Sequence, residues 1–179
     1  MVFPESFFVS NVVQKHIEYA VSQKIPCVLV NSYSDKLPSV LSDNRKGAYL
    51  AGRYLIEHGH KTVALLAGVR SYLSNQERTA GFLQAFQEEG LSIPPELILE
   101  TGSWLYDAAE KVCLNFFNTY TGEMPTALFA FNDRLATGAI NAICKTGRTV
   151  PDDVSVIGYD NLGYYNIISP RITTVETHI

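Results

Sequence analysis

Apolar residues recur along the chain in two alternating patterns. In the first, they repeat at spacings of three and four, as they do on the buried face of an amphipathic helix. This pattern covers residues 12–21, 48–56, 80–86, 105–120 and 135–144. Gly90 and Gly147 follow the third and fifth of these segments, and glycine favours helix ends. The spacing therefore predicts five helices.

The second pattern is a short, continuous apolar segment. It occurs at PCVLVN (26–31), VALLAG (63–68), LILET (97–101), ALFAFND (127–133) and VSVIGYDN (154–161). Strands that are covered on both faces have this composition. Because these strands alternate with helices, we expect an α/β fold with parallel sheets flanked by helices. The final TTVETHI predicts one more strand.

Two polar or irregular stretches interrupt this alternation, at residues 32–47 and 160–176. We interpret both as crossings between the main α/β unit and a second subdomain. The first helix has no strand before it, and the last predicted strand has nothing after it. The chain is therefore expected to be truncated at both ends.

Composition excludes several classes of protein. The net charge is -4 and no stretch is densely basic, which argues against nucleic-acid binding by this chain alone. No apolar run is long enough for a membrane span, and the N-terminus lacks the features of a signal peptide. The three cysteines, Cys27, Cys113 and Cys144, lie in apolar patterns, and we interpret them as reduced core thiols of a cytoplasmic protein.

Polar residues follow several of the predicted strands. Asn31, Asn132, Asp133 and Asp160 stand at or directly after strand ends. Ligands of open parallel sheets bind outside the carboxyl ends of the strands. The alternative is that Asn and Asp only cap helices or form turns, and Asp133 fits that role best.

Further candidates lie in the segments after two other strands. Ser74 and Arg78 are one helical turn apart, which places Arg78 in the first turn of a helix. Trp104 precedes the fourth helix, and Tyr72 is a weaker candidate. Alone, the arginine could be a surface charge and the tryptophan a core residue. As a set with Asn and Asp, they suit a small polyhydroxylated ligand.

The sequence gives little support for catalysis. It has no G-x-S-x-G motif, no P-loop and no G-x-G-x-x-G motif behind a strand. No Cys, His and Asp set has the spacing of metal ligands. We therefore expect no catalytic residues, no metal and no cofactor.

Several ordered blocks resemble the effector-binding core of the lactose/galactose repressor (LacI/GalR) family. They are DNRKGAYLAGRYLIEHGHKTVALLAG, ERTAGFLQAFQEEGL, PTALFAFNDRLATGAINAI, VPDDVSVIGYDN and SPRITTVE. The resemblance implies a periplasmic-binding-protein-like fold with two subdomains, of which one is nearly complete. Residues 1–44 would be part of the N-terminal subdomain, 45–161 the C-terminal effector-binding subdomain, and 162–179 a return to the N-terminal subdomain. The helix-turn-helix domain of the family would be absent.

The same resemblance implies roles for individual residues. Asn31 stands where many members have Asp, and Tyr72 occupies a position that varies among members. The implied effector-binding set is Arg78, Asn132, Asp160, Trp104, Ser74, Tyr72 and Asn31.

The implied function is transcriptional repression controlled by a sugar or related metabolite. Effector binding would reorient the subdomains of a homodimer, and operator DNA would be bound only through the missing domain. Helix 134–145 resembles one at the family's dimer interface, and its small residues would allow close packing. Two alternatives are a periplasmic-type sugar-binding protein for transport or chemosensing, and a sugar-handling enzyme.

Overall fold

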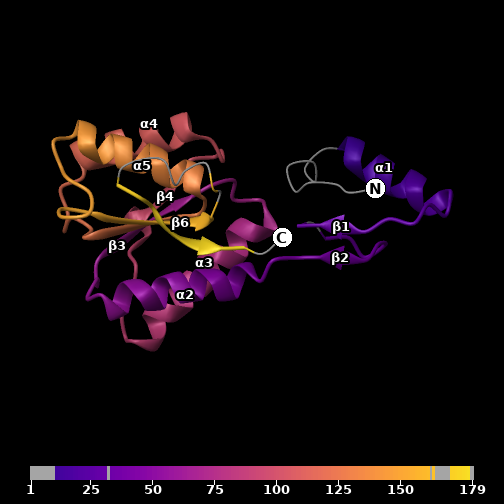
Figure 1. Ribbon diagram of the computed structural model, residues 1–179, viewed down its shortest axis with the longest axis horizontal. Helices are drawn as coiled ribbons and strands as arrows, with labels where there is room; N and C mark the ends of the chain where they lie inside the picture. The colour runs from indigo at the N-terminus through magenta and orange to yellow at the C-terminus, as the bar shows by residue number, and fades with distance from the viewer. Residues whose placement is uncertain (1–10, 32, 162, 164–169, 178–179) are drawn as a thin grey trace. The chain divides into compact units, whose positions relative to one another are not determined.

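The computed structural model describes residues 11–31, 33–161, 163 and 170–177 (Figure 1). They belong to two compact units. The first comprises Met1–Asp43 with Ile179, and the second comprises Asn44–His178.

The first unit contains one helix and two short parallel strands. Helix α1 spans Asn11–Ser22, and β1 (Leu29–Val30) pairs with β2 (Ser39–Val40). Ile17 and Leu29 are fully buried and Leu37 packs against them. The sequence predicted α1 and β1, but β2 is only two residues long within a polar segment and has no apolar pattern that would reveal it.

The second unit is a five-stranded parallel sheet with helices on both faces. The strand order is β4-β3-β5-β6-β7 and every neighbouring pair is parallel. Helices α2 and α3 cover one face, and α4 and α5 cover the other (Figure 1). The elements are α2 (Asn44–Glu57), β3 (Val63–Ala67), α3 (Leu73–Glu88), a 3-10 turn (Pro95–Leu97), β4 (Ile98–Glu100), α4 (Tyr106–Thr119), β5 (Ala127–Ala130), α5 (Asp133–Lys145), β6 (Ser155–Asp160) and β7 (Thr173–Glu176).

The strand register brings the carboxyl ends of the central strands to one edge. Leu65 lies opposite Phe129, which lies opposite Ile157, which in turn lies opposite Thr173. Residues that follow β3, β5 and β6 therefore meet at the same edge of the sheet. The predicted α/β class and parallel sheet are confirmed, although β4 is an edge strand of the described sheet and only partly buried.

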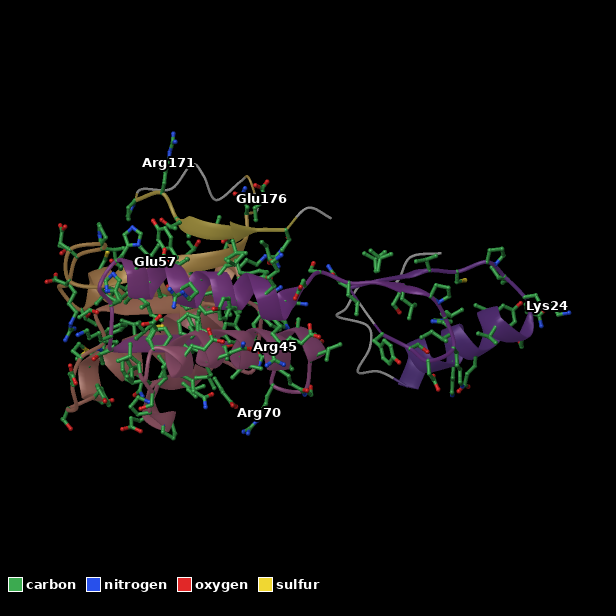
Figure 2. The ribbon with its side chains drawn as sticks, turned by 90° about the horizontal axis from the view of Figure 1, so that it is seen from below. Lys24, Arg45, Glu57, Arg70, Arg171 and Glu176 are labelled. Carbon is green, nitrogen blue, oxygen red and sulfur yellow. The ribbon has the colours of Figure 1, made fainter. Side chains whose placement is uncertain are left out.

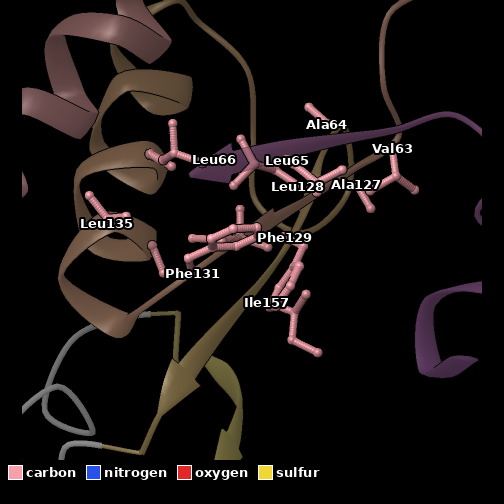
Figure 3. Packing of buried hydrophobic residues seen from close by; sticks show 14 of the residues in the cluster. Val63, Ala64, Leu65, Leu66, Ala127, Leu128, Phe129, Phe131, Leu135 and Ile157 are labelled. Atoms are coloured by element: carbon pink, nitrogen blue, oxygen red, sulfur yellow. The ribbon is translucent and has the colours of Figure 1, made fainter. Parts of the chain in front are cut away.

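Aromatic stacking joins α3 to the sheet. The ring of Phe82 lies 4.8 Å from that of Phe129 and 5.0 Å from that of Phe86, and all three side chains are fully buried. Figure 3 shows Phe129 and Phe131 beside the leucines of β3 and β5. Burial of each such ring contributes about 1.5–3 kcal/mol, so this cluster fixes α3 firmly against the strand ends.

Helices α4 and α5 pack closely because α5 carries small residues. A Cβ atom on Gly138 would lie 2.5 Å from the Tyr106 carbonyl oxygen and 2.8 Å from the Ala109 Cβ. The small residues that the sequence suggested for a dimer contact therefore serve packing within one chain. Ala136, Ala139 and Ala142 are likewise fully buried.

Charged and polar side chains also connect α4 to α5. Glu110 of α4 accepts hydrogen bonds from Lys145 at 2.5 Å and from the Asn141 amide at 2.7 Å. Lys145, followed by Tyr106 and Asn141, lowers the pKa of Glu110 to about 2. Burial and the Glu110 carboxylate raise the pKa of Tyr106 to about 12.

The path of the chain after β6 differs in part from the sequence prediction. Residues 162–179 were expected to return to the first subdomain, but Thr173–Glu176 form β7, which extends the second unit's sheet. The open edge of β6 supplies the backbone groups for this pairing. The crossing near residue 44 coincides with the division between the units, while the remaining domain assignments stay predictions.

The cysteines occupy two kinds of environment. Cys27 and Cys113 are buried thiols, as expected, and burial raises the pKa of Cys113 to about 12. Cys144 is exposed, and it lies one residue before the end of α5. In the described part of the chain, every helix is too short or too polar to cross a membrane.

Candidate functional site

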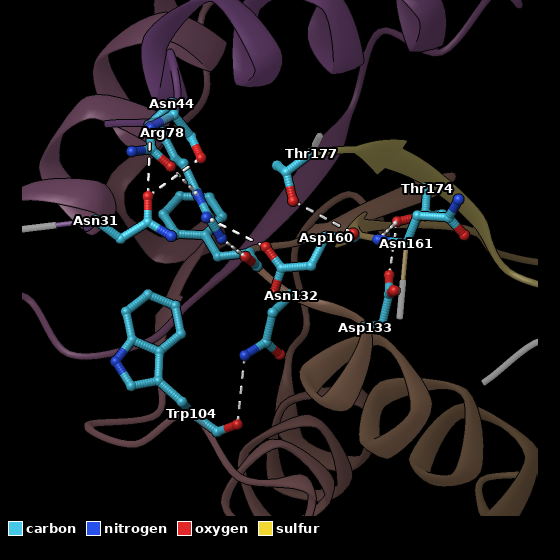
Figure 4. A network of polar contacts seen from close by, with 12 residues as sticks. Asn31, Asn44, Arg78, Trp104, Asn132, Asp133, Asp160, Asn161, Thr174 and Thr177 are labelled. Carbon is cyan, nitrogen blue, oxygen red and sulfur yellow. Dashed lines mark hydrogen bonds and ion pairs between the residues drawn. The ribbon is translucent and has the colours of Figure 1, made fainter. Parts of the chain in front are cut away.

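Arg78 lies at the centre of a polar network at the carboxyl edge of the sheet (Figure 4). Its side chain is almost completely buried, with 7% of the residue exposed. Nε donates to Asn44 Oδ1 at 2.9 Å, and Nη1 donates to the Phe131 carbonyl oxygen. Nη2 donates to Asp160 Oδ1 at 3.3 Å. The guanidinium carbon also lies 3.7 Å from the centre of the Tyr159 ring.

These contacts explain how a permanent charge is tolerated in this position. A buried guanidinium is costly unless its donors are paired and its charge is compensated. Three nitrogens are paired, and the Tyr159 ring adds a cation–π contact. Helix α3 begins at Leu73, earlier than the apolar spacing predicted, so Arg78 lies in its second turn rather than its first.

Asp160 provides the carboxylate of the network. It is the last residue of β6, and its side chain remains 27% exposed. Its φ is 99°, and that of Asn161 is 53°, which is the left-handed region that non-glycine residues rarely adopt. The Asn161 amide donates to Thr174 Oγ1 at 3.4 Å. Such backbone strain costs about 1–3 kcal/mol and is concentrated at binding sites.

Asn132 follows β5 and caps α5. Its Oδ1 accepts a hydrogen bond from the Leu135 amide at 2.7 Å, and its Nδ2 donates to the Trp104 carbonyl oxygen at 3.4 Å. The residue is 7% exposed. The cap therefore accounts for one of its polar atoms, and the predicted ligand contact stays a prediction.

Asp133 has a different role from the expected cap. It is 2% exposed, and its Oδ1 accepts a hydrogen bond from Thr174 Oγ1 at 2.6 Å. The carboxylate thus ties the start of α5 to β7. Since Asn132 already caps the helix, Asp133 instead stabilises the contact between α5 and β7.

Trp104 forms an aromatic wall beside the network. Its indole packs on Gly68, where an added Cβ would lie 2.5 Å from Cε3. The Tyr72 ring lies 6.0 Å from the indole at an angle of 47°. Both side chains are half-buried. Glycine at the end of β3 is thus required for the indole to reach this position.

The remaining two predicted residues have different surroundings. Ser74, in the first turn of α3, is 4% exposed. Asn31 belongs to the first unit, has a φ of 53°, and its Oδ1 accepts hydrogen bonds from the amide and the hydroxyl of Ser42, both at 3.3 Å.

Two further residues of this edge, Asn44 and Asn75, were not predicted from the sequence. Asn44 accepts from Arg78 and donates through Nδ2 to Glu77 Oε2 at 3.2 Å. Asn75 accepts from the Gly68 amide at 2.9 Å. The DN pair at 43–44 was available as a signal, but its pairing with Arg78 spans 34 positions and has no local pattern.

The assembled edge combines donors, an acceptor and an aromatic face. Arg78 and Asp160 offer charge-assisted hydrogen bonds, and Trp104 offers a flat apolar surface. Among the described residues, no group of three or more His, Cys, Asp or Glu is arranged to hold a metal ion. The arrangement therefore suits binding of a small polar molecule.

Comparison with known proteins identifies the family of the chain. A family model described as a periplasmic binding protein-like domain matches residues 53–179. The HTH-type transcriptional repressor PurR of Vibrio parahaemolyticus is 41% identical over 143 residues, which cover 80% of this chain and 42% of that protein. PurR of Pasteurella multocida is 38% identical over 154 residues, or 85% of this chain and 45% of that protein. The chain belongs to the LacI family.

Solved structures agree with this assignment. A regulatory protein of the LacI family from Chloroflexus aggregans has a TM-score of 0.79 and 28% identity, and the match covers 88% of this chain and 57% of that one. A sugar-binding LacI-family regulator from Escherichia coli, solved with phosphate, has a TM-score of 0.79 and 26% identity, covering 97% of this chain and 61% of that one. The chain spans less than half the length of the two PurR repressors. The predicted family and fold are confirmed.

Proposed function

We propose that this chain is the effector-binding core of a cytoplasmic transcriptional regulator. Its effector is a sugar or related small metabolite, held by Arg78 and Asp160, with Trp104 against its apolar face. The observation that carries this proposal is the Nη2–Oδ1 contact of 3.3 Å between two side chains that are 82 positions apart in the sequence. Asn132, Ser74, Tyr72 and Asn31 complete the proposed set.

Regulation follows from differential binding. An effector changes DNA affinity only as far as it distinguishes two arrangements of the subdomains. Operator DNA is bound by a helix-turn-helix domain outside this chain, and the active form is a homodimer. The names of the relatives, which are HTH-type repressors, support regulation.

The alternatives have less support. The relatives are repressors, which favours regulation over a transport or chemosensing protein. Repressors are not enzymes, and the hydrogen-bonded pair of Arg78 and Asp160 suits ligand binding. An enzyme and a binding protein can be distinguished by recovering the bound ligand. A recovered sugar that is chemically changed would indicate an enzyme.

A thermal-shift screen tests the proposed site. The panel contains sugars, sugar phosphates and nucleosides, each added to the wild type and to Arg78→Ala. A ligand at 100 times its Kd stabilises the folded state by about 2.7 kcal/mol, which raises Tm by several degrees. We expect Arg78→Ala to lose the shift that a bound ligand causes in the wild type, each measured from the variant's own Tm.

The matched control is Arg70→Ala. Arg70 lies near the same edge, its side chain is 83% exposed, and it pairs with Glu100 at 3.5 Å. This variant should keep the full shift. An unchanged shift in Arg78→Ala, or an equal loss in both variants, would remove Arg78 from the site.

A further inference from the structure

The second unit contains a cavity at the amino ends of its strands. Its volume is about 200 Å³, and it lies between the C-terminal end of α2 and the first residues of β6 and β7. Arg78 and Asp160 belong to the carboxyl edge, so the cavity is at the opposite end of the same sheet. Figure 2 labels Arg171 and Glu57, which mark this end of the unit.

The floor of the cavity is apolar. It includes Leu55, Ile140, Val156 and Ile157, which are between 3% and 9% exposed. These residues belong to the main hydrophobic core. Because a cavity of about 150 Å³ already accommodates benzene, this one has room for a six-membered ring and one substituent.

The rim of the cavity is polar and carries positive charge. It includes Arg171, His58 and His60, and none of the described residues that line the cavity is acidic. His58 Nδ1 donates to the Tyr54 carbonyl oxygen at 2.7 Å, which fixes the ring against the end of α2. His60 Nδ1 lies 2.9 Å from the Thr126 hydroxyl oxygen.

The Nδ1 atom of each imidazole is therefore occupied by a hydrogen bond within the unit. Within the described residues, neither ring has a hydrogen-bond partner at Nε2. Burial, followed by the nearby His58, lowers the pKa of His60, which favours the neutral ring. Arg171 is then the permanent cation of the rim, and its side chain is exposed at the mouth.

We propose that this cavity is a second ligand site that binds a small monocarboxylic acid with an apolar ring. The ring lies on the apolar floor, and the carboxylate faces Arg171 at the mouth. One permanent cation matches one carboxylate, and the guanidinium fork suits two carboxylate oxygens. The site is separate from the proposed effector site and does not depend on it.

Benzoate is the first probe, with the full chain observed by NMR of its methyl groups. Titration should shift the signals of Ile140, Val156 and Ile157 and leave those of Ile17, in the first unit, unchanged. Benzyl alcohol, which keeps the ring and lacks the charge, should bind about tenfold more weakly.

Two variants test the carboxylate contact. Arg171→Gln changes only an exposed side chain, so the fold should be preserved; it should weaken benzoate about tenfold and leave benzyl alcohol unaffected. Arg70→Gln removes a charge at the other end of the sheet and should change neither affinity.

Three outcomes would overturn the proposal. They are the absence of methyl shifts with benzoate, equal affinity for benzoate and benzyl alcohol, and the same loss in Arg70→Gln as in Arg171→Gln. None of them bears on the effector site, because the thermal-shift comparison of Arg78→Ala uses different ligands and a different edge.

Discussion

The pairing of Arg78 with Asp160 should contribute measurably to folding, and a double-mutant cycle isolates that contribution. The cycle uses Asp160→Asn, Arg78→Gln and the double variant. Asn preserves the shape of Asp and removes its charge. Gln removes the guanidinium, together with its bonds to Asn44 and the Phe131 carbonyl.

The geometry sets the expected coupling energy. At 3.3 Å, Coulomb attraction amounts to about 1.3 kcal/mol in bulk water and about 5 kcal/mol at an effective dielectric constant of 20. The Asp160 side chain is 27% exposed while that of Arg78 is 9% exposed, so solvent screens the pair partly. We therefore expect a coupling of about 1–2 kcal/mol, and a loss of about 3 kcal/mol for Arg78→Gln alone because more contacts disappear.

Urea denaturation of the four proteins measures the free energy of unfolding. Asp152→Asn is the matched control, since Asp152 is exposed, and it should change stability by less than about 0.5 kcal/mol. Coupling below about 0.3 kcal/mol, which is within the error of additivity, would show that the pair does not stabilise the fold. Stabilisation by Asp160→Asn would also contradict a stabilising pair.

Three further predictions address other parts of the second unit. Gly68→Ala should displace the indole of Trp104, the only tryptophan, and shift its fluorescence emission to longer wavelength; unchanged emission would contradict the packing. Asn132→Ala should destabilise the protein by about 1 kcal/mol through loss of the α5 cap, whereas Asn132→Asp should keep most of the stability. Glu110→Gln should be less stable than the wild type at neutral pH, because a carboxylate with a pKa lowered to about 2 stabilises the fold above its unfolded pKa. As pH falls from about 4.3 toward 2, this contribution is lost and the two denaturation curves should converge, whereas a constant difference would argue against the Lys145 pair.

The apolar pattern predicted most of the fold because buried positions recur at regular intervals along a helix and without interruption along a covered strand. The stripe at 105–120 corresponds to α4, and the uniformly apolar segments at 63–68 and 127–133 correspond to β3 and β5. Where burial gives no such period, prediction failed. Strand β2 is short and polar, and the start of α3 precedes its first buried aromatic residue by nine positions.

The candidate site was predictable for a different reason. Parallel strands place their carboxyl ends at one edge, so the residues that end the predicted strands already indicate that Asp160 and Asn132 lie at the same edge. Two of the groups that hold Arg78 were not predictable in this way. One is a backbone carbonyl, that of Phe131, and the other is Asn44, which follows no strand.

The sequence pattern also did not predict which residues are exposed at the end of a helix. Cys144 continues the apolar spacing of α5, yet it is exposed one residue before the helix ends. The small residues of α5 are a similar case. Their composition indicates close packing, but it does not indicate which element packs against them. In this chain the partner of Gly138 is α4.

The most direct test of the proposed effector site is a crystal structure of the chain with a ligand from the thermal-shift screen. We expect ligand oxygen or nitrogen atoms within about 3 Å of the Arg78 guanidinium and the Asp160 carboxylate. The Trp104 indole should lie against the ligand's apolar face. A ligand bound elsewhere on the chain, with the pair of Arg78 and Asp160 untouched, would contradict the proposed site.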